Sequence, residues 1–274
     1  MAEEYKSLHP QKFYNHYLKN GIRPDGRTFD KTRSIMLNVK SIPNADGSAI
    51  CKIGQTTIIC GVKAELCKPK PEAPSEGFII PNVDLPPLCS ARFRPGPPSD
   101  QAQVFSQFIG DIIQNSGCIN LKSLCLHPDK LAWCLYADLI CLDYDGSIID
   151  ACVIALMSAL RTMTLPTIDY DPALENVQTN LEDRRPLMTD GSPVSTTFVV
   201  FDDQYILTDP TAEEEDLSSG TVTVVINKGE LCYVHKPGGT PLEQSILADC
   251  ISKAKARTYF IQDLIFSVIN SSNN

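Results

Sequence analysis

The stretch LDYDGSIIDACVIALMSAL, residues 142–160, joins an apolar run to a helical pattern through a short turn. Residues 131–142, which lead into it, are nearly continuously apolar and hold the only tryptophan, Trp133. Such a run favours a strand buried on both faces, although periodicity alone would also permit a helix. The Asp-Tyr-Asp-Gly sequence at 143–146 predicts a turn at its end.

Two amphipathic helices are predicted in this part of the chain. One follows the turn, with apolar residues at helical spacing from Ile149 to Leu160. Asp150 lies in its first turn, where a negative charge favours the positive end of the helix dipole. The other precedes the apolar run and has its apolar residues at 104–113. Its opposite face is polar and carries no cation; it holds Gln103, Gln107, Asp111 and Gln114.

Alternating or β-branched runs predict the strands of the first half. They lie at 35–39, 48–53 and 56–62, and the last two are joined by Gly54-Gln55. A two-residue loop with glycine first is typical of a type II′ hairpin. Residues 68–98 are dense in proline, which predicts an irregular segment around one strand at 78–85.

The second half repeats the pattern of the first. Strands are predicted at 194–201, 205–208, 221–226 and 231–236, followed by a long helix with apolar residues between 246 and 268. Two successive units of β-hairpin plus helix predict an α+β duplication. The expected division is residues 1–165 for the first half, including an amphipathic helix at 11–20, residues 166–192 for a connector, and residues 193–274 for the second half.

Composition excludes several classes of protein. The 274 residues are 43% hydrophobic, which is enough to fill one large core or two modest ones. No run approaches the roughly 20 apolar residues of a membrane span, and the acidic N-terminus does not resemble a secretory signal, so an intracellular protein is expected. The net charge of −9 argues against nucleic-acid binding over a broad face.

The eleven cysteines and four histidines do not form the spacings of a disulfide scaffold or a metal site. Six cysteines lie inside apolar runs, where a free thiol behaves as a small hydrophobe: Cys51, Cys60, Cys134, Cys141, Cys152 and Cys232. Reduced, buried thiols are therefore expected, with no metal and no cofactor.

Four motifs, taken in order, resemble the phosphorolytic RNase PH family over about residues 21–265. They are RPDGR (23–27), ADGSAICKIGQTTIICGVKAE (45–65), the stretch 142–160 and TDPTAEEE (208–215). Within that family the chain is similar to the non-catalytic branch of the eukaryotic exosome. PNVDLPPLCSARFRPGPP (81–98) and LTDPTAEEE (207–215) stand where the active branch has arginine-rich and aspartate-rich segments.

The resemblance implies an RNase PH-like fold, also described as ribosomal protein S5 domain 2-like. It further implies a hetero-hexameric ring of RNase PH-like exosome subunits, capped by S1/KH subunits and served by associated exoribonucleases, with RNA passing through the ring channel. The implied work is 3′ to 5′ RNA processing and degradation, including rRNA maturation and mRNA turnover, in the cytoplasm, nucleus and nucleolus. No membrane partner is implied.

The resemblance also locates the vestiges of an active site. In active relatives an arginine in the turn before the helix clamps phosphate, and the matching position here is Ile149, next to Asp150. A second set of arginines holds RNA phosphates in active relatives, and the matching positions here are Gln107, Asp111 and Gln114. Asp209 and Glu215 match the two catalytic acids by spacing. We therefore expect no catalysis, a structural role for Asp209, and a solvated acidic loop at 213–216.

Arg92 and Arg94 flank Phe93 on a proline-stiffened loop and form the strongest remaining basic feature. Cations beside an aromatic ring suit contact with single-stranded RNA, whereas the same arginines could pair with a neighbouring subunit or hold the loop. Two other functions compete with the ring-subunit hypothesis. One is an active phosphate-dependent exoribonuclease or nucleotidyltransferase using Asp209 and Glu215; the other is a free-standing RNA-binding module, which the acidic balance disfavours.

Overall fold

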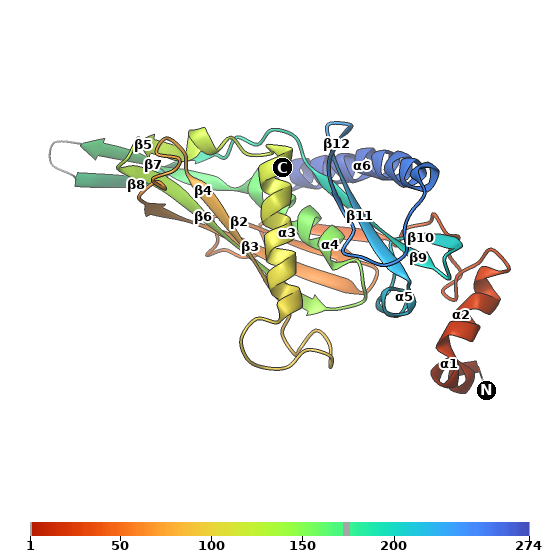
Figure 1. Cartoon of the computed structure of the whole chain (residues 1–274). Coiled ribbons are helices and arrows are strands. Elements are labelled where there is room, and N and C mark those ends of the chain that lie inside the picture. The colour runs from red at the N-terminus through yellow and green to blue at the C-terminus, as the bar shows by residue number, and fades with distance from the viewer. Residues whose placement is uncertain (1, 172–175, 274) are drawn as a thin grey trace.

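The computed structural model describes residues 2–171 and 176–273, and it contains three sheets and six α-helices in that part of the chain (Figure 1). The α-helices are α1 (Ala2–Leu8), α2 (Pro10–Leu18), α3 (Asp100–Ser116), α4 (Ile148–Thr162), α5 (Ala212–Leu217) and α6 (Gln244–Asn273). The strands are β1 (Ile35–Val39), β2 (Gly47–Ile53), β3 (Thr56–Cys67), β4 (Phe78–Asp84), β5 (Cys125–His127), β6 (Leu131–Asp143), β7 (Thr164–Asp171), β8 (Asn176–Pro186), β9 (Val194–Phe201), β10 (Tyr205–Thr208), β11 (Gly220–Asn227) and β12 (Glu230–His235).

The first sheet has the order β1-β2-β3-β6-β4, with β5 paired to the end of β6. Its β2–β3 hairpin turns at Gly54, whose φ of +59° is the conformation that the predicted II′ loop requires. The apolar run at 131–142 forms strand β6, as predicted, but the prediction that both faces of this strand are buried is wrong. In the part of β6 that follows Leu135, the side chains of Tyr136, Ile140 and Leu142 are exposed on the outer face of the sheet. No helix in the described chain covers that face.

The second sheet has the order β10-β9-β11-β12, as the repeated strand pattern predicted. Its strand β9 is buried along its whole length. The predicted N-terminal helix is α2, and it packs against this second sheet: the ring of Tyr14 stacks on Phe201 with centroids 5.8 Å apart. The N-terminal helix, which the sequence analysis assigned to the first half, therefore contacts the second half.

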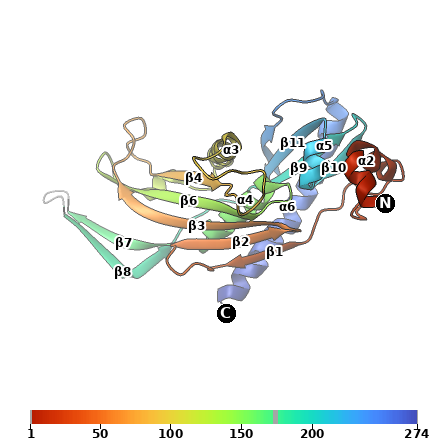
Figure 2. The same cartoon turned by 90° about the horizontal axis from the view of Figure 1, so that it is seen from below.

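Helices α4 and α6 fill the space between the two sheets, as Figures 1 and 2 show. Helix α4 contacts β2 and β3 on one side and β9 on the other, and it is buried from Ile148 to Leu160. Helix α6 covers the second sheet through Cys250 and Ala254, and its later residues Ile261 and Ile265 join the large core under the first sheet. The two halves thus share one apolar interior.

The segment expected to be a connector forms the β7–β8 hairpin, which projects from the body on the left of Figure 1. Residues 178–180 and 182–186 of β8 are exposed, whereas β7 packs against the large core through Leu165 and Ile168. The hairpin therefore lacks the regular alternation of a strand with one buried face. None of the helices in the described chain is long and apolar enough to span a bilayer. All eleven cysteines are free, and of the six expected to be buried, five are buried and Cys232 is only partly buried.

Candidate functional site

A cavity of about 270 Å³ lies where the β6–α4 turn meets α5, the start of α3 and the face of the second sheet. Glu215, Ile149 and Arg92 all line it, so the structure brings together three residues that the sequence analysis singled out separately. Asp209 does not line it. Its floor and walls come from both halves of the chain, which explains why no single motif describes it.

The β6–α4 turn is fixed against the start of α5 by close backbone contact. Gly146 has a φ of +74°, and a Cβ at this position would lie 2.5 to 2.7 Å from backbone atoms of Pro210, Thr211 and Ala212. Only glycine fits such an approach. The hydroxyl of Ser147 donates to the carbonyl of Pro210 at 3.0 Å, which ties the two segments together.

Glu215 is held inside the cavity by one hydrogen bond on each carboxylate oxygen. The main-chain N–H of Ser147 donates to Oε1 at 2.7 Å, and the hydroxyl of Tyr144 donates to Oε2 at 3.2 Å. Burial raises the pKa of Glu215 to about 7, against the lowering effects of these hydrogen bonds and of Arg33. Glu215 therefore titrates near neutral pH.

Asp209 is enclosed by arginines on the other side of the turn. Its carboxylate receives the Arg33 guanidinium at 2.7 Å and the Arg33 main-chain N–H at 2.7 Å, and Arg27 lies at 3.3 Å. Burial would raise the pKa of Asp209, but the hydrogen bonds and charge of Arg33 outweigh it and lower the pKa to about 2. The carboxylate is fully buried and permanently ionised at neutral pH, so it cannot supply a proton.

Asp150, which follows the clamp position, directs its charge away from the cavity. Its side chain is fully buried and turns toward the second half, where it pairs with Arg257 of α6 at 2.5 Å. It also accepts hydrogen bonds from the main-chain N–H and the hydroxyl of Thr197. Its charge is thus matched, while the neighbouring Ile149 is 7% exposed and presents only hydrocarbon to the cavity.

The acidic run 213–216 is not the solvated loop that the sequence analysis predicted. It belongs to α5, which begins at a capping box formed by Thr211 and Glu214. Glu214 is buried and ion-paired with Arg23 of the RPDGR motif. A short helix with a buried ion pair therefore replaces the loop, and the pairing explains why RPDGR and TDPTAEEE occur together.

Arg92, Phe93 and Arg94 do not form an exposed stacking surface. Phe93 is 8% exposed and packs edge-on against Tyr144, with centroids 5.5 Å apart, so its predicted base stacking is excluded in this conformation. Arg92 lies over the Tyr144 ring at 5.3 Å and pairs with Asp216 at 3.1 Å. Arg94 is exposed.

The polar face of α3 lies away from this cavity. Gln107, Asp111 and Gln114 line a separate groove between α3 and β4. The Gln107 amide donates to Asp111 at 2.9 Å, and the hydroxyl of Tyr233 donates to the same carboxylate at 3.3 Å. As predicted, α3 brings no cation to this face.

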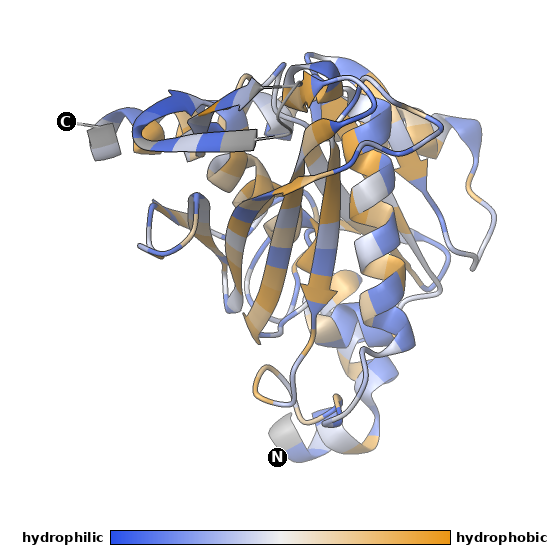
Figure 3. Cartoon of the chain, turned by 90° about the vertical axis from the view of Figure 1, so that its left-hand side faces the viewer, coloured by the Kyte–Doolittle hydropathy of each residue, from blue (hydrophilic) through white to orange (hydrophobic). Residues whose placement is uncertain are grey.

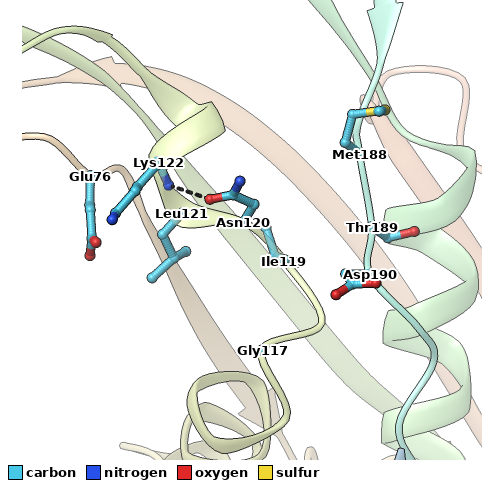
Figure 4. A pocket seen from close by; sticks show the side chains of 9 residues that line it. All are labelled: Glu76, Gly117, Ile119, Asn120, Leu121, Lys122, Met188, Thr189 and Asp190. Carbon is cyan, nitrogen blue, oxygen red and sulfur yellow. Dashed lines mark hydrogen bonds between the residues drawn. The ribbon is translucent and has the colours of Figure 1, made fainter. Parts of the chain in front are cut away.

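Another hollow, between the end of α3 and residues 188–190, is shown in Figure 4. Its charged groups do not converge on a common point. Asp190 pairs with Lys228 at 2.5 Å, and the Asn120 side chain caps the following 3₁₀ turn by accepting from the Lys122 main-chain N–H at 3.1 Å. We therefore place the candidate site at the cavity around Glu215. Within the described residues, no group of three potential metal ligands occurs there or elsewhere.

Sequence reasoning missed three of the groups that shape the site. Arg33 and Arg257 carry no motif of their own, and Tyr144 appeared only as part of a turn. Arg33 is 176 residues from Asp209 in the sequence, and Arg257 is 107 residues from Asp150. The sequence shows that arginines occur near the acidic motifs, but it does not show which arginine pairs with which carboxylate.

The sequence of this chain is similar to those of several known proteins. The sequence profile of the 3′ exoribonuclease family, domain 1, matches residues 31–166, and that of domain 2 matches residues 191–257. An exosome complex component, rrp43, of Schizosaccharomyces pombe is 43% identical over 92% of this chain and 94% of its own length. Exosome complex component Rrp42 of Pyrococcus furiosus is 32% identical over 94% and 92%, respectively.

A solved structure gives the same fold. A chain of the Archaeoglobus fulgidus exosome with RNA bound to the active site superimposes with a TM-score of 0.83 at 28% identity, covering 92% of this chain and 96% of that chain. The predicted RNase PH-like α+β fold is therefore confirmed.

Proposed function

Because this chain belongs to the 3′ exoribonuclease family, we propose that it is a non-catalytic ring subunit of an RNA exosome. It supports 3′ to 5′ RNA processing and degradation by scaffolding neighbouring RNase PH-like subunits, S1/KH cap subunits and associated exoribonucleases around an RNA channel. Support for the assembly comes from two relatives that are exosome components. Their sequences match this chain over 94% and 92% of their own length.

The observation that carries the non-catalytic assignment is the capture of Asp209 by Arg33. A catalytic acid must reach the reacting group, but both oxygens of Asp209 are occupied by Arg33 inside the fold. The side chain of Ile149, at the position implied for the phosphate clamp, offers neither charge nor hydrogen-bond donors.

Electrostatics act in the same direction. Phosphate entering this cavity would meet Glu215 and Asp216, and one such charge pair at about 4 Å costs roughly 1 to 4 kcal/mol in water-like to surface-like surroundings. Arg92 is the one guanidinium among the lining residues, and Asp216 already pairs with it. A phosphorolytic site needs more positive charge than this cavity holds.

The exposed apolar surface supports a chain that works with partners. Met36, Ile80 and Tyr136 lie exposed on the first sheet, whose strands are largely coloured as hydrophobic in Figure 3. Phe260 and Phe266 are 61% and 62% exposed on α6. Ile80 and Tyr136 are register partners on the neighbouring strands β4 and β6, and adjacent exposed apolar side chains of this kind are typical of protein interfaces.

Two further parts of the proposal concern detail. Arg92 and Arg94 contribute an electrostatic contact to RNA, with Phe93 serving as the buried support of their loop rather than as a stacking ring. The chain works in cytoplasm, nucleus and nucleolus, which fluorescent tagging tests. Its two halves are residues 1–165 and 193–274, joined by a connector at 166–192, and limited proteolysis tests this division.

The test of the main proposal measures release of nucleoside diphosphate from oligo(A) in phosphate buffer by the purified chain and by the ring assembled with it. The chain alone is expected to release none, and Glu215→Gln is expected to leave the activity of the ring unchanged. Glu215→Gln is the informative change because Glu215 lines the cavity whereas Asp209 stabilises the fold. Phosphate-dependent shortening by the wild-type chain, lost in Glu215→Gln, would establish the enzyme hypothesis instead.

Assembly is tested separately by native mass measurement after co-purification. Neighbouring RNase PH-like chains at equal stoichiometry are expected. A stable monomer with no tendency to associate would contradict the ring proposal.

A further inference from the structure

We propose that the cavity around Glu215 is a binding site for a small organic cation, an alkylguanidinium or alkylammonium group held on the Glu215 carboxylate. The inference rests on the charge balance, the walls and the size of the cavity, and it does not depend on the proposed ring function. A site whose position corresponds to a phosphate clamp in related enzymes has thus acquired the opposite charge preference.

The charges of the lining residues leave Glu215 without a partner of opposite sign. Arg92 and Asp216 pair with each other at the mouth. Among the residues that the structure describes, Glu215 makes no salt bridge, since the nearby Arg33 is bound to Asp209 and Asp145. A cation that enters the cavity therefore supplies a missing ion pair.

The walls suit a cation with an alkyl chain. Phe105, Phe108, Tyr144 and His235 supply aromatic surface, and Ile149 supplies aliphatic surface. The face of Tyr144 already receives the Arg92 guanidinium at 5.3 Å, which shows the cation–π contact that a ligand would make. Arg92 therefore already makes, within the chain, the guanidinium–aromatic contact that we expect of a ligand in the cavity.

The volume fits a compact ligand. About 270 Å³ equals roughly nine water molecules at liquid density, which is enough for an aliphatic amine or guanidine of similar atom count. Agmatine, a butyl chain with a guanidinium at one end and an ammonium at the other, serves as the probe. The uncharged control is N-butylurea, which has a urea in place of the guanidinium and a methyl end in place of the ammonium.

The ionisation of Glu215 makes binding depend on pH. Burial raises its pKa to about 7, opposed by Ser147, Tyr144 and Arg33, while Asp150 adds a small raising effect from α4. The other charged groups at the cavity, Arg92 and Asp216, are paired with each other. Burial lowers the pKa of His235 below its usual 6.5, against the raising effect of Asp111. The cation binds the ionised carboxylate, and its affinity rises by about tenfold between pH 6 and pH 8.

The experiment titrates agmatine into the full chain, assembled with its ring neighbours, and follows binding by ligand-observed NMR. Glu215→Gln is expected to weaken binding about tenfold or more, because a charge-assisted pair is lost. Glu213→Gln is the matched control, since Glu213 lies on the same helix and pairs with Lys6 outside the cavity; it is expected to bind as the wild type. Arg92→Ala opens the mouth and is expected to strengthen binding.

Three outcomes would overturn the proposal: equal binding of N-butylurea, equal loss of affinity in Glu213→Gln and Glu215→Gln, or an affinity that does not change between pH 6 and pH 8. The pH series uses the wild-type chain, so it remains decisive even where a variant fails to fold. Stronger binding of inorganic phosphate than of agmatine would identify an anion site instead.

Discussion

Arg33 holds Asp209 from two directions: its guanidinium donates to Oδ1 at 2.7 Å, and its own main-chain N–H donates to Oδ2 at 2.7 Å. The same guanidinium donates to the main-chain carbonyls of Asp145 and Pro210. One arginine thereby joins the segment after RPDGR, the β6–α4 turn and the segment before α5. A carboxylate in the position of a catalytic acid has become the centre of a structural joint.

Replacing Asp209 is therefore expected to change stability rather than chemistry. Asp209→Asn removes the buried carboxylate from Arg33 and leaves the guanidinium with the partly exposed Asp145, and breaking a buried pair typically costs about 3 to 5 kcal/mol. The free energy of unfolding, measured by urea titration at pH 7, checks this, with the exposed Asp169→Asn as control. Unchanged stability combined with loss of RNA decay by the assembled ring would contradict the structural role.

The contact between Arg33 and Asp209 also makes the stability of the chain depend on pH. The pKa of Asp209 falls from 3.8 to about 2 on folding, so its contribution of about 2 kcal/mol is present above pH 3.8 and is lost as the pH falls toward 2. The variant Asp209→Asn should lack this part of the acid transition. Parallel acid-unfolding curves of variant and wild type would be the opposite result.

Glu215 is expected to act on stability with the opposite sign. Its pKa rises from 4.5 to about 7, so the stability contributed by its protonated form is fully present below pH 4.5 and is lost as the pH rises through 7. The loss is up to about 3 kcal/mol. Glu215→Gln should remove this decline and stabilise the chain at pH 8, as thermal unfolding at pH 5 and pH 8 would reveal. A decline of equal size in Glu213→Gln and Glu215→Gln would show that another group titrates.

Local patterns in the sequence predicted the elements of the fold because their causes are local. Gly54 sets the β2–β3 hairpin, and the apolar spacing of 149–160 sets α4. The ion pairs of the site could not be predicted in this way, since Arg257 reaches Asp150 only after the chain folds back over 107 residues. The β7–β8 hairpin escaped prediction because β7 packs against the core through Leu165 and Ile168, three residues apart, whereas alternation arises from burial of every second residue on one face.

Restoring one cation at the lost clamp is expected to leave the chain inactive. Ile149→Arg would place a guanidinium in the cavity beside Glu215, while Asp150 stays bound to Arg257 and does not compete for it. The α3 face with Gln107 and Asp111 still offers nothing to hold an RNA end. Release of nucleoside diphosphate from oligo(A) in phosphate buffer measures the outcome, and Ile149→Met controls for the change in packing. Activity from Ile149→Arg alone would show that the other cationic site is dispensable.

The loop around Phe93 separates an electrostatic role from a structural one. Replacing Arg92 and Arg94 together by Glu is expected to weaken RNA protection by the assembled ring, and to do so more at low salt than at high salt, because charge contacts to phosphate are screened. Arg94→Glu alone should give part of the effect without disturbing the fold, since Arg94 is exposed, whereas Arg92→Glu also breaks the pair with Asp216.

Phe93→Ala provides the contrast within the same loop. Its ring is buried against Tyr144, so truncation is expected to destabilise the chain by about 3 kcal/mol while leaving the salt dependence of RNA protection intact. Nuclease footprinting at 50 and 200 mM salt, run beside thermal unfolding, distinguishes the two roles. If the double arginine variant prevents ring assembly but assembled rings protect RNA normally, the arginines hold a neighbouring subunit. If Phe93→Ala removes RNA protection without loss of stability, the aromatic side chain of Phe93 contacts RNA after a movement of the loop.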